Sequence, residues 1–160
     1  MLTYYVLKYL HVIGATVLLG TGAGIAFFML LAHRQGDSAV TAGVARIVVI
    51  ADFIFTASAV VLQPITGFLL VWWVGYSPLE GWIVLSVLLY FVTGAFWIPV
   101  VFMQMRMRDL AIAAASAHKP LPEAYHRTFR RWFWFGFPAF ASVIAILWLM
   151  VARPRIALPL

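Results

Sequence analysis

Two side chains near the start of the sequence could carry chemistry inside an apolar segment. Lys8 and His11 are three residues apart, so a helix places them on one face about one turn from the membrane surface. An imidazole there could bind haem or a metal ion, or relay protons. The alternative is an interfacial pair, in which Lys8 reaches the lipid headgroups and His11 hydrogen-bonds a neighbour.

A histidine that binds haem needs a second ligand or an open position, and no other histidine lies at the depth of His11. Met150, near the end of the last apolar segment, has the right depth for a His–Met arrangement. Methionine at helical spacing more often faces lipid or fills a core. His11 and Met150 are therefore candidate cofactor-binding residues, together with the neighbouring Lys8.

Later apolar segments contain a second set of polar side chains. Asp52 is the only carboxylate within such a segment, and an unpaired carboxylate in lipid is costly. Three arginines lie at its level: Arg34, Arg46 and Arg106. We expect a structural Asp–Arg ion pair, with a proton- or ion-coupling site as the alternative. Gln63 precedes Pro64, and the carbonyl group that this proline frees could line a cavity or be bonded by a neighbour.

Glycines thin the middle of the first apolar segment, where Gly20 and Gly24 form a small-xxx-small pair. Such a notch lets another helix, or a flat ring, approach the backbone closely, and helix packing is the interpretation we favour. No catalytic triad, phosphate loop, pair of catalytic carboxylates or metal-ligand spacing occurs in the sequence. The catalytic residues therefore stay unknown, and no metal site is predicted.

The composition places these residues in a membrane. Of 160 residues, 65% are hydrophobic and 10% are charged, whereas soluble domains are about half apolar and about a quarter charged. So small a globule cannot bury that excess. We predict one all-α domain, residues 1–160, built as an integral membrane four-helix bundle. The spans run over about 4–33, 47–73, 82–103 and 133–152, the third helix continues into the cytoplasm, and Pro138 interrupts the fourth.

The distribution of charge predicts the orientation of the bundle. Four spans place the first and third loops on one side, with eight of the eleven basic residues. The positive-inside rule then puts these loops in the cytoplasm and both termini outside, in a bacterial inner membrane. The net charge of +6 is explained by this topology rather than by nucleic acid. The partner that we expect is the lipid bilayer; a homo-oligomer or a membrane-complex partner stays open.

Several strings resemble an uncharacterised bacterial family of predicted integral membrane proteins, a domain of unknown function. They are LKYLH, GTGAGIAFF, AHRQGD, ADFIFTASAVVLQPITG, VVFMQMRMRDLA, LPEAYHRTFRRWF and LMVARP. This resemblance covers nearly the whole chain and implies a membrane location without an activity.

More distantly, the LK-x-x-H opening is similar to that of the J-type membrane protoporphyrinogen oxidase and of copper-resistance D-type membrane domains. The resemblance to the oxidase implies haem b at His11. The essential lysine of that family has no counterpart here, where the corresponding region holds Glu80. The sequence thus leaves three functions open: a b-type haem or redox-associated membrane protein, a small transporter that uses Asp52 and Gln63, and a non-catalytic scaffold subunit.

Overall fold

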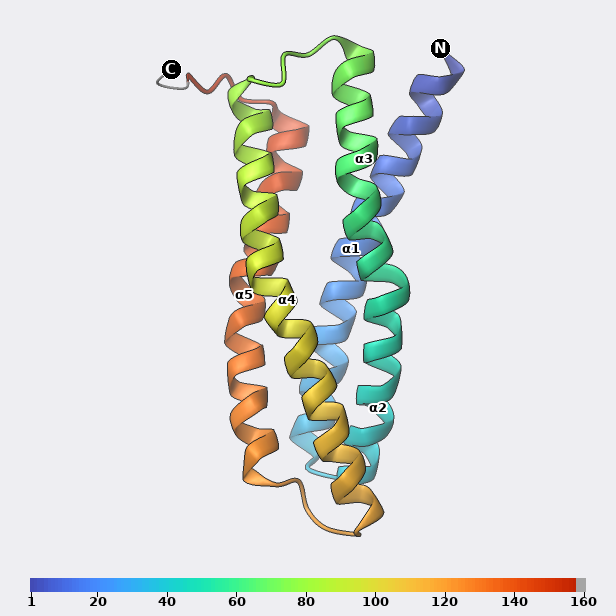
Figure 1. Cartoon of the computed structure of the whole chain (residues 1–160), viewed down its shortest axis with the longest axis vertical. Coiled ribbons are helices and arrows are strands. Elements are labelled where there is room, and N and C mark those ends of the chain that lie inside the picture. Colours follow the sequence, from blue (N-terminus) through green and yellow to red (C-terminus); the bar gives the residue numbers. More distant parts are fainter. Residues whose placement is uncertain (158–160) are drawn as a thin grey trace.

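The computed structural model describes residues 1–157 as an elongated helical bundle (Figure 1). Its elements are α1 (Leu2–Gln35), α2 (Ser38–Ala51), the π-helix η1 (Asp52–Thr56), α3 (Ala57–Val74), α4 (Gly81–Ser116) and α5 (Glu123–Ala152). Because α2, η1 and α3 follow one another without a break, four long rods result, each apolar enough to cross a membrane. The all-α bundle of four membrane helices is confirmed.

The helices extend beyond the predicted spans at the end where α1 meets α2. As expected, α4 continues past the third span to Ser116. The fourth span was predicted to begin near residue 133, but α5 begins at Glu123 and includes the basic–aromatic run before it. The predicted interruption at Pro138 is wrong, because α5 runs through this residue. With 36 residues, α4 is roughly 54 Å long against about 30 Å of hydrocarbon, so part of it lies beyond the apolar layer.

Local sequence signals set the turns between the rods. Asp37 caps α2, since its Oδ1 accepts a hydrogen bond of 2.8 Å from the backbone N–H of Val40. Gly36 ends α1 with a φ of 72°, and Gly75 ends α3 with a φ of 80°, a left-handed conformation that favours glycine. The sequence predicted that Asp37 or Ser38 would cap this helix and that the link with Gly75, Pro78 and Gly81 after α3 would be a turn; both predictions are confirmed, with Asp37 as the cap.

The two ends of the bundle differ in what they carry. The start of α1, the end of α5 and the loop 75–80 lie at one end, called here the termini end (Figure 1). The turns 36–37 and 117–122 lie at the other, called here the basic end because most arginines are near it. Residues 153–157 form no helix. The tail was predicted to be unstructured, and its residues 158–160 lie outside the described part.

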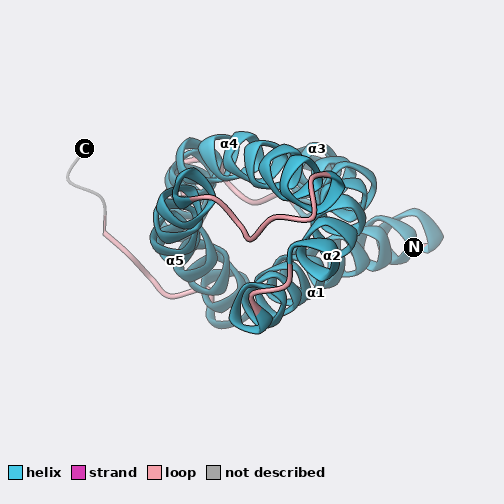
Figure 2. Cartoon of the chain, turned by 90° about the horizontal axis from the view of Figure 1, so that it is seen from below, coloured by secondary structure: helices cyan, strands magenta, loops and turns pink. Residues whose placement is uncertain are grey.

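The helices pack as pairs around a ring, seen end-on in Figure 2. Close contacts join α4 to α5 and to α2, and α1 to α3 and to α2. The consecutive helices α3 and α4 stand apart toward the termini end (Figure 1). An apolar hollow of about 210 Å³ between them is lined by Phe68, Pro78, Ile83, Val84, Val87 and Leu88.

The main apolar core fills the basic half of the bundle. Its buried members are Ile25, Met29, Ala42, Ala45, Val48, Val100, Met107, Ala111, Leu121, Tyr125, Phe129 and Trp132. An aromatic stack joins α1 to α5 within it, since the rings of His33 and Phe129 lie 3.7 Å apart and nearly parallel, at 9°. Packing of this kind holds helices at fixed distances, so the basic half acts as the rigid base of the molecule.

Candidate functional site

His11 is buried where three helices meet in the termini half. Its Nδ1 lies 2.8 Å from the Oγ1 of Thr66 on α3. Its Nε2 lies 3.3 Å from the Sδ of Met150 on α5. The His–Met arrangement that the sequence suggested is thus a direct contact, and Thr66 is the neighbour that hydrogen-bonds the ring.

Two tautomers of this imidazole fit its neighbours. With the Thr66 hydroxyl donating to the Leu62 carbonyl over 2.8 Å, Nδ1–H donates to Thr66 Oγ1, and Nε2 presents a lone pair toward the sulfur of Met150. With the hydroxyl turned to Nδ1, Nε2–H donates to the Met150 sulfur, the weak N–H···S hydrogen bond that a 3.3 Å contact fits. In the first tautomer Nε2 and Sδ are two ligand atoms that face each other.

Two glycines make room for this contact. A Cβ on Gly67 would lie 3.3 Å from Cε1 of His11, so the imidazole rests against bare backbone there. A Cβ on Gly14 would overlap the side-chain amide of Gln63. That amide donates a hydrogen bond of 2.8 Å to the backbone carbonyl of His11. Gln63 therefore positions the helix turn that carries the imidazole instead of lining a cavity.

The other residues predicted for the cofactor site do not join His11. Lys8 is exposed, and its Nζ lies 5.7 Å above the ring centre of Tyr4. A Cβ on Gly20 would meet nothing within 4 Å, and one on Gly24 would meet only Phe28 of the same helix. Within residues 1–157, no other helix packs closely against Gly20 or Gly24; the close approach in this glycine cluster, which also contains Gly14 and Gly22, occurs at Gly14 against Gln63 of α3.

The donor set at His11 fits a haem iron in its chemistry, since histidine and methionine are the axial pair of many cytochromes. The distance between His11 Nε2 and Met150 Sδ is shorter than two ligands on opposite sides of an iron ion require. Bonds from a metal to imidazole nitrogen and to sulfur are about 2.0 and 2.3 Å, so ligands on opposite sides of one ion are about 4.3 Å apart. The observed 3.3 Å is about 1 Å shorter. Rotation about the three side-chain bonds of Met150 can supply that distance.

Asp52 is the second candidate centre, and it lies at the first residue of η1. Its side chain is 3% exposed. The indole N–H of Trp97 donates to Oδ1 over 3.4 Å. The amide of Gln104 is assigned the orientation that satisfies both of its neighbours, in which its N–H donates to Oδ2 over 3.1 Å. The oxygen of the same amide accepts from the indole N–H of Trp132 over 3.3 Å. Two neutral donors of α4 therefore hold this carboxyl group, and Trp132 of α5 holds the amide of one of them.

The predicted Asp–Arg ion pair is wrong. Among residues 1–157 the ion pairs are Arg108–Asp109 and Arg130–Glu123, both at the surface. The three arginines named for Asp52 are all exposed: Arg34, Arg46 and Arg106. A long arginine side chain reaches water or headgroups more favourably than it enters the bundle, which explains the difference.

Sequence reasoning also missed the partners of Asp52. Gln104 was expected to leave the bilayer with the arginines that follow it, yet it is 3% exposed. The spacing of the sequence could have predicted this burial. Gln104 is four residues after Val100 and three before Met107, so all three lie on the buried face of α4. The tryptophans were not singled out, since tryptophan at a helix end more often marks the membrane interface.

The carbonyl group that Pro64 leaves without a helical partner is hydrogen-bonded within the bundle. Proline lacks an N–H, so the carbonyl group of Val60, four residues earlier, loses its helical partner. The hydroxyl of Tyr90 on α4 donates to that carbonyl oxygen over 2.8 Å. Of the two outcomes left open for this group, bonding by a neighbour is the one that occurs. Asp52 and Gln63 belong to separate networks, one on α4 and α5 and the other on α1.

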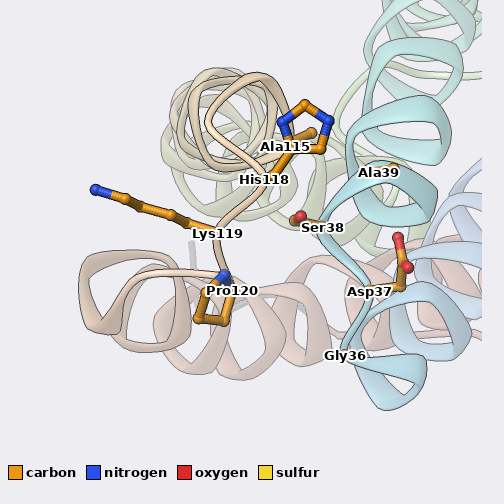
Figure 3. Close-up of a pocket in the computed structure, with 8 residues that line it drawn as sticks. All are labelled: Gly36, Asp37, Ser38, Ala39, Ala115, His118, Lys119 and Pro120. Carbon is orange, nitrogen blue, oxygen red and sulfur yellow. The ribbon is translucent and has the colours of Figure 1, made fainter.

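At the basic end, a shallow hollow of about 390 Å³ separates the two turns (Figure 3). Its lining is Gly36, Asp37, Ser38, Ala39, Ala115, His118, Lys119 and Pro120. Lys119 points away from the hollow, and the carboxylate of Asp37 is used as the cap of α2 (Figure 3). No buried charged side chain of the described residues lines it, so the hollow is a gap between turns and not a candidate site.

Comparison with known proteins places the chain in one family. No curated protein and no solved structure matches it. A family model with the description "Predicted integral membrane protein (DUF2269)" matches residues 5–154, which include all four rods and both candidate centres. The chain is therefore a multi-pass integral membrane protein, and it belongs to this family of predicted integral membrane proteins.

Proposed function

We propose that this protein is a redox-associated membrane protein in which His11 and Met150 hold a b-type haem. The contact of His11 Nε2 with Met150 Sδ, at 3.3 Å, is the observation that carries the proposal. Thr66 supports it, because the tautomer in which Nδ1–H donates to Thr66 leaves Nε2 its lone pair. When bound, the haem would supply one-electron transfer, and a His–Met pair favours a raised reduction potential.

An absorbance spectrum of protein purified in detergent from haem-replete cells tests this function. We expect a Soret band that is lost in His11→Ala and shifted in Met150→Leu. His118→Ala is the matched control, since His118 is exposed in the turn at the basic end, and it should leave the band unchanged. A colourless preparation of folded protein would exclude haem, and a band unaffected by His11→Ala would exclude this ligand.

We propose an orientation in the plasma membrane of a bacterium in which the basic end faces the cytoplasm. Eight of the eleven basic residues belong to the loops and helix ends there, which supports this orientation through the positive-inside rule. The chain contains no cysteine, so single cysteines can be labelled without removing any. In whole cells an impermeant maleimide should label Ser77→Cys and spare Ser38→Cys. Labelling of Ser38→Cys but not of Ser77→Cys would show that the protein has the reverse orientation.

Transport is the alternative that one observation favours, because Asp52 is a buried acidic group without a cation beside it in the described structure. Gln63 does not share this centre, so a transport site would rest on Asp52 and its α4 partners. In proteoliposomes, Asp52→Asn should abolish flux while the protein stays folded. Co-purification of a stable partner, with neither colour nor flux, would instead support a scaffold subunit.

A further inference from the structure

Asp52 is set apart from the other acidic residues of the chain by its burial. The sequence contains five acidic residues, and the other four lie at helix ends or at the surface: Asp37, Glu80, Asp109 and Glu123. Asp52, in contrast, is enclosed by α4 and begins a turn of π-helix in which the N–H of Ala57 bonds the carbonyl of Asp52. Single π turns inserted in longer helices occur frequently at functional sites.

The groups around this carboxyl group favour a proton over a metal cation. Na⁺, Mg²⁺ and Ca²⁺ require several oxygen atoms around them. Asp52 instead meets two N–H groups, from Trp97 and Gln104. The amide oxygen of Gln104 is turned away to Trp132. Hydrogens that point at the carboxyl group would repel a metal ion, whereas a proton adds directly to the carboxylate oxygen.

Among residues 1–157, no positively charged side chain pairs with the carboxylate. The charged side chains on the surrounding helices at this level are exposed: Arg34 on α1, Arg46 on α2, Arg106 on α4 and Arg131 on α5. Lys8 and His11 lie toward the termini end: His11 contacts Thr66, which is 14 residues, roughly 21 Å by helical rise, from Asp52. In an apolar surrounding, an uncompensated carboxylate favours its protonated form.

A protonated carboxyl group needs an acceptor for its O–H, and the bundle provides one nearby. Thr56 lies four residues after Asp52. Its buried Oγ1 makes no hydrogen bond of good geometry, although the Asp52 carboxyl group lies within its reach. Buried hydroxyl groups are almost always bonded, so the Thr56 hydroxyl pairs with this carboxyl group, as a donor to the carboxylate or, directly or through one water molecule, as the acceptor of the acid proton.

The interior around Asp52 differs on its two sides. Toward the termini end, the buried side chains include the hydroxyl groups of Thr93, Ser142, Thr66 and Ser86, and those of Thr66, Ser86 and Thr93 bond carbonyls of their own helices. Toward the basic end, Met29 and Met107 are fully buried in the apolar core, which also contains Tyr125 with its unpartnered hydroxyl group. The buried hydroxyl groups of Thr41 and Thr128 on this side bond nearby backbone carbonyls. Protons reach a buried group along polar side chains and water, so we expect entry from the termini end.

We infer that Asp52 is a proton-binding site of the membrane bundle, loaded from the termini end through Thr56. Hydronium at that end gives its proton to a carboxylate oxygen and becomes water. The N–H donors from α4 hold the carboxyl group in place in both protonation states. This inference stands apart from the metal centre proposed at His11, and it requires no transported solute other than the proton.

Infrared spectroscopy of the protein in lipid vesicles tests the proton. At neutral pH the spectrum should contain the carbonyl band of a protonated carboxyl group, shifted in D₂O and absent in Asp52→Asn. Asp109→Asn, which changes an exposed carboxylate, should leave that band unchanged. Replacing Na⁺ by choline should have no effect on it. If no such band appears at any pH at which the protein stays folded, or if Na⁺ abolishes it, the inference is overturned.

The side of entry is tested at two buried hydroxyl groups that make no hydrogen bond of good geometry. Thr56→Val removes the one toward the termini end, and Tyr125→Phe removes the one near the basic end. Both changes nearly preserve side-chain shape. After transfer to D₂O, the Asp52 band should exchange about tenfold more slowly in Thr56→Val, the loss expected for one hydrogen-bonding group. Exchange in Tyr125→Phe should match the unchanged protein. Slowing in Tyr125→Phe alone, or in neither variant, would overturn entry from the termini end.

Discussion

In the basic half of the bundle most buried side chains are apolar or aromatic, whereas toward the termini end most of them carry a hydroxyl group or an imidazole. Twelve buried residues form the core of the basic half, among them Met29, Met107 and Phe129. The buried side chains of the termini half include His11, Thr56, Thr66, Ser86, Thr93 and Ser142. The same four rods thus have a packed half and a hydrogen-bonded half.

This difference has a physical consequence for helix spacing. Lipid is as apolar as a leucine side chain, so membrane helices associate through close packing and hydrogen bonds. In the termini half, single contacts connect the α1–α3 pair to the α4–α5 pair: His11 with Met150, Tyr90 with the carbonyl of Val60, and Tyr76 with Arg153. The two helix pairs can therefore move apart in this half by breaking only a few contacts. The site proposed at His11 lies in this half, and the site proposed at Asp52 lies at its boundary with the packed half.

The largest effect should come from breaking the packed half. Phe129 is 5% exposed and stacks on His33, so Phe129→Ala should destabilise the protein by about 3–5 kcal/mol. Phe137 lies on the same helix but is 53% exposed, and Phe137→Ala should change stability by less than about 0.5 kcal/mol. Equilibrium unfolding in mixed micelles measures both. Equal losses would show that the basic half is no more tightly packed than the lipid-facing surface.

The next effect concerns the boundary between the halves. Gln104→Leu leaves an oxygen of Asp52 and the indole N–H of Trp132 without partners, which should cost about 1–3 kcal/mol. Gln35→Leu makes the same replacement at an exposed position at the end of α1 and should be close to neutral. The same unfolding experiment compares them. A Gln104→Leu protein as stable as the parent would mean that Asp52 has other partners.

The helices and turns were largely predictable from the sequence, and the partners of the buried polar groups were not. The long apolar runs, the cap at Asp37 and the turn at Gly75 follow from local chemistry, and each predicted element formed. Which partner a buried group takes depends on the rotation of one helix against another, and no local signal fixes that. Asp52 was therefore recognised as needing a partner, but an arginine was predicted where Trp97 and Gln104 supply the donors.

The termini half shows the same limit at His11 and at the glycines. Depth along the helices pointed to Met150, because depth follows from residue number and helical rise. Thr66 was not predicted as the partner of the ring, since the rotation of α3 sets it. The glycine pair Gly20 and Gly24 matched a packing motif, yet the close approach occurs at Gly14. A motif indicates where backbones can meet, and the rotation of the rods decides whether they do.

A hydrogen bond between the two helix pairs can be tested by a double-mutant cycle. Tyr90→Phe removes the donor to the Val60 carbonyl and should cost about 1 kcal/mol. In a Pro64→Ala background the alanine N–H can bond that carbonyl within α3, so the same change should cost much less. The coupling between the two positions is measured by unfolding of all four proteins. Strictly additive losses would show that Tyr90 stabilises α4 by some other contact.

The smallest effect should separate two glycines of α1. Alanine favours a helix over glycine by up to about 1 kcal/mol, so Gly20→Ala, which meets nothing within 4 Å, should be neutral or stabilising. At Gly14 the new Cβ displaces the Gln63 amide from the carbonyl of His11, and the lost hydrogen bond offsets that gain. Gly14→Ala should therefore be about 1 kcal/mol less stable than Gly20→Ala. If Gly20→Ala is instead the more damaging change, the open face of α1 is covered in the membrane by another helix, and the hydrogen-bonded half is more tightly packed than the single chain indicates.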